Sequence, residues 1–106
     1  MENIKQDLEK IISLIVDLAA PDQIILFGSY ARGDYREDSD IDLLILKKGL
    51  QNPREVKQKV YRALYDHRIN IDVDVLAIDY DRYLKIVDDI GFIYNTIRDD
   101  GKVIYG

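Results

Sequence analysis

The chain has 106 residues, 47% of them hydrophobic and 33% charged, which leaves room for one domain over residues 1–106 with one modest core. Its formal net charge of −5 argues against an extended nucleic-acid surface, and the absence of cysteine excludes disulfide frameworks and thiolate metal sites. Neither a signal peptide nor an apolar run of membrane-spanning length is visible, so we expect a cytoplasmic protein without a membrane segment.

The first half of the chain reads as a helix followed by two strands. Apolar residues recur at helical spacing from about 3 to 20, and Pro21 ends this helix because proline cannot continue the hydrogen-bond ladder. The apolar run 24–27 has the length of a buried strand and stops at a glycine. We expect a short helix around 29–33 and a second strand over 40–46.

The middle of the chain predicts a longer helix. Asn52 is suited to cap it, Pro53 fits its first turn, and Glu55 can bond back to the cap, so the helix should run to about Asp66. One face of this helix is apolar, and the other carries Arg54, Lys57, Gln58 and Arg62. That basic face is either solvated surface or a docking face for an acidic partner or for nucleotide phosphates. His67, the single histidine, should be exposed and without a catalytic role.

The last third of the chain alternates well enough over 69–78 for a third strand. A final helical region starts at Asp79, is interrupted at Gly91 and leads into a short strand over 102–105. The predicted order is therefore helix, strand, short helix, strand, helix, strand, helix, strand, which is an α/β fold. We expect the first three strands to form a mixed sheet, with carboxylates at one end and the helices packed on one face.

The candidate functional residues lie where the first two predicted strands meet the turn that connects them. Asp40 and Asp42 project from the same side of the second strand, because side chains alternate along a strand. Two carboxylates this close raise one another's pKa unless a cation lies between them, and Mg²⁺ prefers oxygen ligands of this kind. Gly28 and Ser29 follow the first strand and offer backbone N–H groups and a hydroxyl to phosphate oxygens. This combination indicates nucleotide transfer.

The spacing of these residues resembles a known signature. Gly28-Ser29, ten residues, and then Asp40-x-Asp42 is similar to the motif of the polymerase-β-like nucleotidyltransferases. The surrounding Gly-Ser-Tyr-Ala-Arg-Gly and Ser-Asp-Ile-Asp-Leu resemble the minimal nucleotidyltransferases (MNT), small members commonly encoded beside a HEPN-domain protein. The resemblance covers nearly the whole chain.

The resemblance implies a third acid in a strand that is followed by apolar residues and a helix. Asp72 and Asp74 share one face of the predicted third strand. Asp74 matches the family register better, whereas Asp72 either lines the same pocket or lies at the strand's solvated end. Asp40, Asp42 and Asp74 would then be the catalytic residues and would hold two Mg²⁺ ions, which activate the attacking oxygen and steady the leaving oxygen.

The reaction implied is adenylyl transfer from ATP to a hydroxyl. Gly28 and Ser29 would hold the β- and γ-phosphate oxygens, and Arg32 is close enough in sequence to contact the same phosphates. A surface salt bridge from Arg32 to Asp34 or Glu37 is the competing interpretation.

The resemblance also suggests the acceptor: a tyrosine hydroxyl of a HEPN toxin, for which this chain would be the antitoxin, in a possible hetero-oligomer. The chain has no second domain to hold an acceptor, which favours a partner that brings its own binding surface. Two other classes stay open. The protein could mask its toxin without chemistry, or it could transfer nucleotides to a small molecule.

Overall fold

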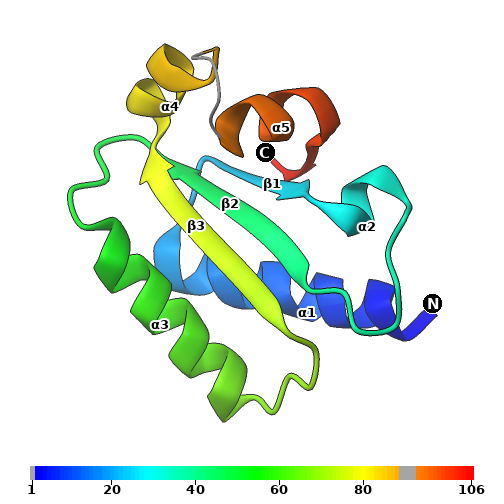
Figure 1. Cartoon of the computed structure of the whole chain (residues 1–106). Helices are drawn as coiled ribbons and strands as arrows, with labels where there is room; N and C mark the ends of the chain where they lie inside the picture. The colour runs from blue at the N-terminus through cyan, green and yellow to red at the C-terminus, as the bar shows by residue number, and fades with distance from the viewer. Residues whose placement is uncertain (1, 89–92) are drawn as a thin grey trace.

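The computed structural model describes residues 2–88 and 93–106 of the chain. Figure 1 shows the elements in order: α1 (Glu2–Ala19), β1 (Gln23–Phe27), α2 (Ser29–Arg32), β2 (Ile41–Lys47), α3 (Pro53–Asp66), β3 (Val73–Asp79), α4 (Tyr80–Ile86), α5 (Ile93–Asp100) and β4 (Lys102–Tyr105). The α/β order predicted from the sequence is confirmed, with the last helical region divided into α4 and α5. The interruption predicted at Gly91 lies outside the described residues.

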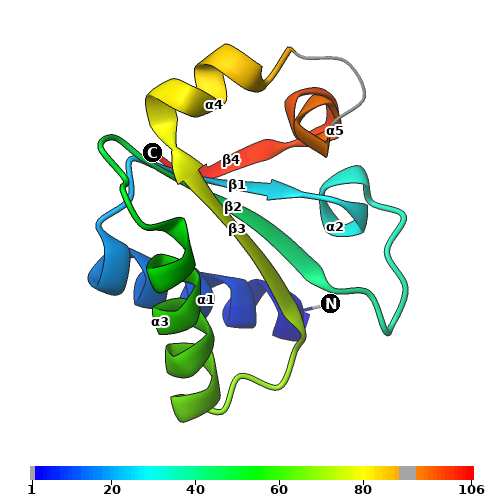
Figure 2. The same cartoon turned by 60° about the vertical axis from the view of Figure 1, so that its left-hand side comes forward.

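The four strands form one mixed sheet in the order β3-β2-β1-β4. β1 is antiparallel to both β2 and β4, whereas β2 and β3 are parallel and are joined through α3 (Figure 2). A parallel pair needs such a crossover because the chain must return to the same end of the sheet. Because β3 comes first in the sheet order, it is an edge strand, and α3 lies beside it (Figure 2).

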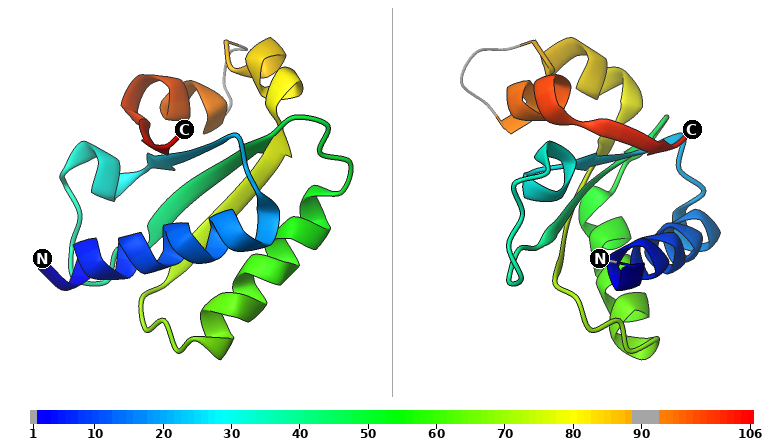
Figure 3. Two further views of the ribbon diagram at one scale, coloured as in Figure 1. Left: turned by 180° about the vertical axis from the view of Figure 1, so that it is seen from behind. Right: turned by 90° about the vertical axis from the view of Figure 1, so that its right-hand side faces the viewer.

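Helices cover both faces of the sheet. α1 and α3 lie on one face, and α4 and α5 lie on the other (Figure 3). The α1/α3 face buries alternate residues of β2, namely Ile41, Leu43 and Ile45, and the α4/α5 face buries Leu44 and Leu46. The expectation that the helices pack on one face was therefore wrong. The sheet is buried on both sides because Leu43–Leu46 is apolar at every position, so both faces of β2 need cover.

β3 begins four residues later than the sequence predicts. Arg68 has a left-handed backbone with φ of 55°, and the Ile69 N–H donates to the carbonyl of Leu64 at 3.0 Å, so the chain turns tightly out of α3. Ile69 and Ile71 pack against the α1/α3 core from this connection. Their apolar side chains thus contribute to the core from outside the strand.

The start of α3 follows the predicted capping. The Asn52 side-chain oxygen accepts from the Glu55 N–H at 3.1 Å, and Pro53 occupies the first turn. This satisfies one of the N–H groups that a helix start leaves without an acceptor. His67 is exposed at the other end of α3, as expected.

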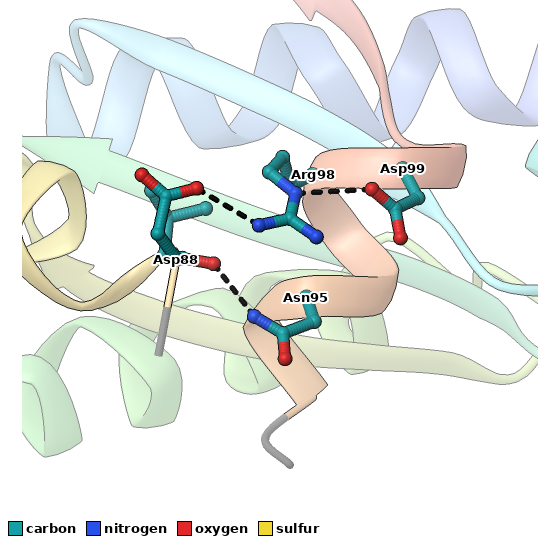
Figure 4. Close-up of polar contacts among 5 residues, drawn as sticks. Asp88, Asn95, Arg98 and Asp99 are labelled. Carbon is teal, nitrogen blue, oxygen red and sulfur yellow. Dashed lines mark hydrogen bonds and ion pairs between the residues drawn. The ribbon is translucent and has the colours of Figure 1, made fainter. Parts of the chain in front are cut away.

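Polar contacts hold α5 against the end of α4 (Figure 4). The Asn95 side-chain amide donates to the Val87 carbonyl at 2.8 Å, and the Arg98 guanidinium pairs with Asp88 at 2.8 Å and with Asp99 at 3.0 Å. The contacts with Val87 and Asp88 connect α5 to the residues after α4, whereas the pair of Arg98 with Asp99 lies within α5. Within the described residues, no helix is both long enough and apolar enough to cross a membrane.

Candidate functional site

The β1–β2 hairpin brings Gly28 against Asp42. Phe27 pairs with Asp42 in the antiparallel register, so the residue after β1 meets the carboxylate of β2. Gly28 has φ of 75° and ψ of −157°, a region that only glycine occupies without strain. A Cβ atom at this position would overlap the Asp42 carboxylate. The glycine is thus required both by its backbone angles and by its neighbour.

The turn after Gly28 is a single helical turn. The N–H groups of Ala31 and Arg32 both donate to the Gly28 carbonyl at 3.1 Å, and Gly33 ends α2 in the left-handed region with φ of 86°. The first N–H groups of a helix have no acceptor inside it, so Ser29 stands at the open start of this turn. The turn that begins at Gly28 therefore starts beside Asp42, and phosphate binding by Gly28 and Ser29 stays a prediction.

Three carboxylates lie around this corner. Asp42 is in register with Asp74 of the parallel neighbour β3, and Asp40 lies one residue before β2. Burial raises the pKa of the Asp42 carboxyl, and the nearby charges of Asp74 and Asp40 raise that pKa further, whereas Arg32 opposes them. Negative charge is therefore crowded at Asp42, although Asp40 and Asp74 are exposed.

Asp72 takes a different position. It precedes β3, its side chain is exposed, and its carbonyl accepts from the Ile41 N–H at 2.9 Å. The strand register thus sets Asp74, and not Asp72, opposite Asp42. Among residues 2–88 and 93–106, no three His, Cys, Asp or Glu side chains converge on a point that could hold a metal ion.

Arg32 lies at the end of α2 and forms a salt bridge with Asp34. A surface salt bridge of this kind was the alternative interpretation to phosphate binding. The Arg32 guanidinium contacts Asp34 at 3.2 Å and Asp100 at 4.0 Å, and its side chain is 40% exposed. Its positive charge lowers the pKa of the Asp42 carboxyl, against the larger effect of burial and the effects of Asp74 and Asp40. The contact with phosphates stays a prediction.

Tyr61 of α3 is a residue of this corner that sequence reasoning missed. Its hydroxyl accepts from the Val75 N–H at 2.8 Å and lies 3.4 Å from Asp74 Oδ1, to which it can donate. Burial raises the pKa of Tyr61, as does the charge of Asp74. No sequence pattern reveals this contact, because it depends on how α3 lies along the edge of β3. The only sequence signal is that Tyr61 follows Arg54 and Lys57 at helical spacing.

The chain is similar in sequence to proteins of a known family. The model of the family "Polymerase beta, Nucleotidyltransferase" matches residues 9–106. A Methanocaldococcus jannaschii protein, provisionally named a protein adenylyltransferase, is 39% identical over 85 residues, which are 80% of this chain and 83% of the relative. A second protein from the same organism with the same kind of name is 42% identical over 59 residues, 53% of this chain and 40% of that relative.

Solved structures agree in fold. A chain of a toxin–antitoxin complex with AMP-PNP is 29% identical with a TM-score of 0.60, over 92% of this chain and 72% of that one. A chain of a complex between a tri-AMPylated Shewanella oneidensis HEPN toxin and an MNT antitoxin is 27% identical with a TM-score of 0.55, over 96% and 71% of the two chains. The resemblance stated from the motif is thereby confirmed. This chain belongs to the polymerase beta nucleotidyltransferase family.

Proposed function

We propose that this chain is a Mg²⁺-dependent adenylyltransferase that transfers AMP from ATP to a tyrosine hydroxyl of a HEPN-domain toxin and thereby acts as its antitoxin. The observation that carries the proposal is the corner at which Gly28 contacts Asp42 and Asp42 faces Asp74. The similarity to protein adenylyltransferases and to toxin–antitoxin complexes supports the choice of a protein acceptor.

Residues 1–106 act in this proposal as one catalytic domain. The backbone N–H groups of the Gly28–Ser29 turn and the Ser29 hydroxyl bind the β- and γ-phosphate oxygens, which stabilises the charge that develops on the leaving group. Arg32 exchanges part of its contact with Asp34 for the same phosphates. Because ATP is a cytoplasmic metabolite, we place the reaction in the cytoplasm, within a hetero-oligomer of this chain and its toxin.

The donor set fits Mg²⁺. Asp40, Asp42 and Asp74 supply hard oxygen ligands. Burial raises the pKa of Asp42, and the charges of Asp74 and Asp40 raise it further, a crowding of negative charge that a cation would relieve. Mg²⁺ keeps water and substrate phosphates among its ligands, so one or two carboxylates can suffice for each of two ions. When bound, the metal would polarise the α-phosphate and neutralise charge on pyrophosphate.

The acceptor is deprotonated at the other side of the corner. Asp74 takes the proton of the incoming hydroxyl, the hydroxyl oxygen forms a bond to the α-phosphorus, and the bond between that phosphorus and the bridging oxygen to the β-phosphate breaks. Pyrophosphate leaves in line with the attack. The products are the adenylylated hydroxyl, pyrophosphate and one proton, so atoms and charge balance.

The test is the intact mass of the toxin. The purified chain is mixed with the HEPN-domain protein encoded beside it, ATP and Mg²⁺, and the toxin should gain one or more AMP groups while pyrophosphate is released. The double variant Asp40→Asn, Asp42→Asn should leave the mass unchanged. Asp17→Asn, which removes an exposed carboxylate from α1, should behave as wild type.

The same experiment separates catalysis from masking. Toxin modified by the wild-type chain should stay inactive after the antitoxin is removed, because a phosphodiester does not dissociate as a complex does. Neutralisation by the double variant, equal to that by the wild type and without any change of mass, would overturn the catalytic proposal in favour of masking. A gain of AMP on a small molecule and not on the toxin would favour the third class.

A further inference from the structure

A groove runs along the outer edge of β3, next to the catalytic corner but outside it. It has a volume of about 520 Å³, lies between α3 and α5, and is lined on the α3 side by Arg54, Lys57 and Tyr61. Its other walls include Leu76 and Ala77 of β3 and Tyr94 of α5. We call it the α3–β3 groove. Figure 2 shows β3 between α3 and the two helices α4 and α5.

The groove opens beside the third acid. Tyr61 forms part of its wall, and the same hydroxyl lies 3.4 Å from Asp74 Oδ1. A chain lying in the groove would therefore reach Asp74 at its end. Because the sheet order is β3-β2-β1, the phosphate-binding turn after β1 lies on the opposite side of Asp42 from this groove. An in-line displacement places the attacking and leaving groups on opposite sides of the phosphorus, so the acceptor belongs on the β3 side.

The groove is positively charged in an acidic protein. No acidic side chain lines it, and no carboxylate of the described residues lies within ion-pair distance of Arg54 or Lys57. By contrast, Lys59 on the neighbouring face of α3 is paired with Glu55 at 3.0 Å. Two cations without partners, in a chain of net charge −5, complement an acidic ligand.

The edge of β3 also offers backbone groups to the groove. The Val75 N–H points away from β2, since it donates to the Tyr61 hydroxyl. Backbone groups alternate between the two edges of a strand, so the N–H of Ala77 points to the same outer edge. An extended peptide can pair with a strand edge of this kind through its own backbone.

We propose that the α3–β3 groove seats an acidic, extended segment of the protein substrate and guides its acceptor hydroxyl to Asp74. Arg54 and Lys57 pair with acidic side chains of that segment, and the edge at Ala77 pairs with its backbone. This inference rests on the proposed adenylyl transfer to a protein and names the surface that selects the acceptor.

The test compares two double charge reversals in the full chain. Arg54→Glu, Lys57→Glu alters the groove, whereas Lys10→Glu, Lys85→Glu changes the net charge equally at exposed positions of α1 and α4, outside the groove and off α3. The substrate is the neighbour-encoded HEPN-domain protein. The groove variant should raise its KM by about tenfold or more, since interface charge reversals cost that much, while the Kd for ATP with Mg²⁺ stays within about twofold of wild type. The control should match wild type in both values.

The dependence of KM on ionic strength is a second test, because a folding defect would not change it in this way. The KM of the wild type for the toxin should rise steeply with ionic strength, and the KM of the uncharged variant Arg54→Gln, Lys57→Gln should rise much less. Circular dichroism confirms that each variant is folded.

The outcomes are distinct. An unchanged KM in the groove variant, with active wild type, overturns the groove proposal and leaves adenylyl transfer intact. An equal loss of ATP affinity would assign the two cations to the nucleotide and also overturn the groove proposal. No transfer by the wild type overturns the proposed function itself.

Discussion

Gly28 and Asp42 constrain each other at the scale of single residues. We expect Gly28→Ala to lower the free energy of unfolding by about 1–3 kcal/mol, because alanine is strained at a φ of 75°. The rate of AMP transfer should fall by more than this loss of stability explains, since the added Cβ displaces the Asp42 carboxylate. Thermal unfolding and the rate of AMP transfer measure the two effects.

Gly33→Ala is the matched control for this change. Gly33 also has a positive φ, 86°, but among the described residues no heavy atom beyond its two chain neighbours lies within 4 Å of the position that its Cβ would take. This variant should lose stability without a comparable loss of transfer. If both variants lost the same fraction of activity, the contact between Gly28 and Asp42 would not matter for the reaction.

Substitution of Asp74 and substitution of Asp72 should have different effects on transfer. Asp74→Asn should abolish transfer, because Asp74 faces Asp42, whereas Asp72→Asn should keep a measurable fraction. Both should remain folded, and Asp74→Asn should be at least as stable as wild type without metal, since it removes charge that crowds Asp42. Single-turnover transfer to the toxin measures activity. Loss in Asp72→Asn with retention in Asp74→Asn would reverse the assignment.

At the scale of elements, Tyr61 links α3 to the edge of β3. Tyr61→Phe removes the acceptor of the Val75 N–H, and a lost hydrogen bond in a partly buried setting should cost about 1 kcal/mol. Transfer should fall several-fold in kcat with little change in the KM for ATP, because Asp74 loses a hydrogen-bond partner. Tyr65→Phe, on the same helix but 84% exposed, should change neither value.

The elements themselves were predicted well wherever the signal was local. The first two strands, the cap of α3 at Asn52 and the closing strand follow from short patterns of apolar, turn and capping residues. The start of β3 could not be predicted, because the apolar residues Ile69 and Ile71 look like strand residues in the sequence. In the structure they pack against the core from the turn before β3. The cover on both faces had a signal in the unbroken run Leu43–Leu46, which the one-face expectation overlooked.

The site was predictable in part for the same reason. Gly28 and Asp42 belong to one hairpin, so their proximity follows from two strands and the turn between them. The pairing of Asp42 with Asp74 needs the register of a parallel pair, and the contact of Tyr61 with Asp74 needs the placement of a helix. Such relations depend on packing between distant segments, which no local pattern encodes.

At the scale of the whole molecule, the raised pKa of Asp42 makes stability depend on pH when no divalent cation is present. The folded chain disfavours the ionised form of the Asp42 carboxyl. The stability that the neutral carboxyl allows is fully present below its ordinary pKa of 3.8, and it is lost as pH rises through the raised pKa of the folded state. Asp42→Asn lacks this loss. In EDTA, its Tm should therefore gain on that of wild type as pH rises from below 3.8 towards neutrality.

Mg²⁺ with ATP should reverse this order at neutral pH. A ligand that binds only the folded state stabilises it, so wild type should gain in Tm and Asp42→Asn should gain little. Scanning calorimetry across pH, with and without Mg²⁺ and ATP, gives both comparisons. A Tm difference in EDTA that did not vary with pH would mean that Asp42 carries no unfavourable charge in the fold.

The topology of the sheet also sets an order of assembly. Gly28 meets Asp42 across β1 and β2, which are consecutive antiparallel strands. Residues 28–40 between these strands form a shorter loop than residues 48–72 between β2 and β3, so the first loop closes at a smaller entropic cost. Asp74 arrives only after α3 has folded across the sheet and β3 has paired in parallel, which is a slower, non-local step. A chain emerging from the ribosome would therefore hold the glycine turn and its facing carboxylate before it has Asp74, the proton acceptor that we propose. In the proposed mechanism, it would gain the capacity to modify a partner protein only with the third strand.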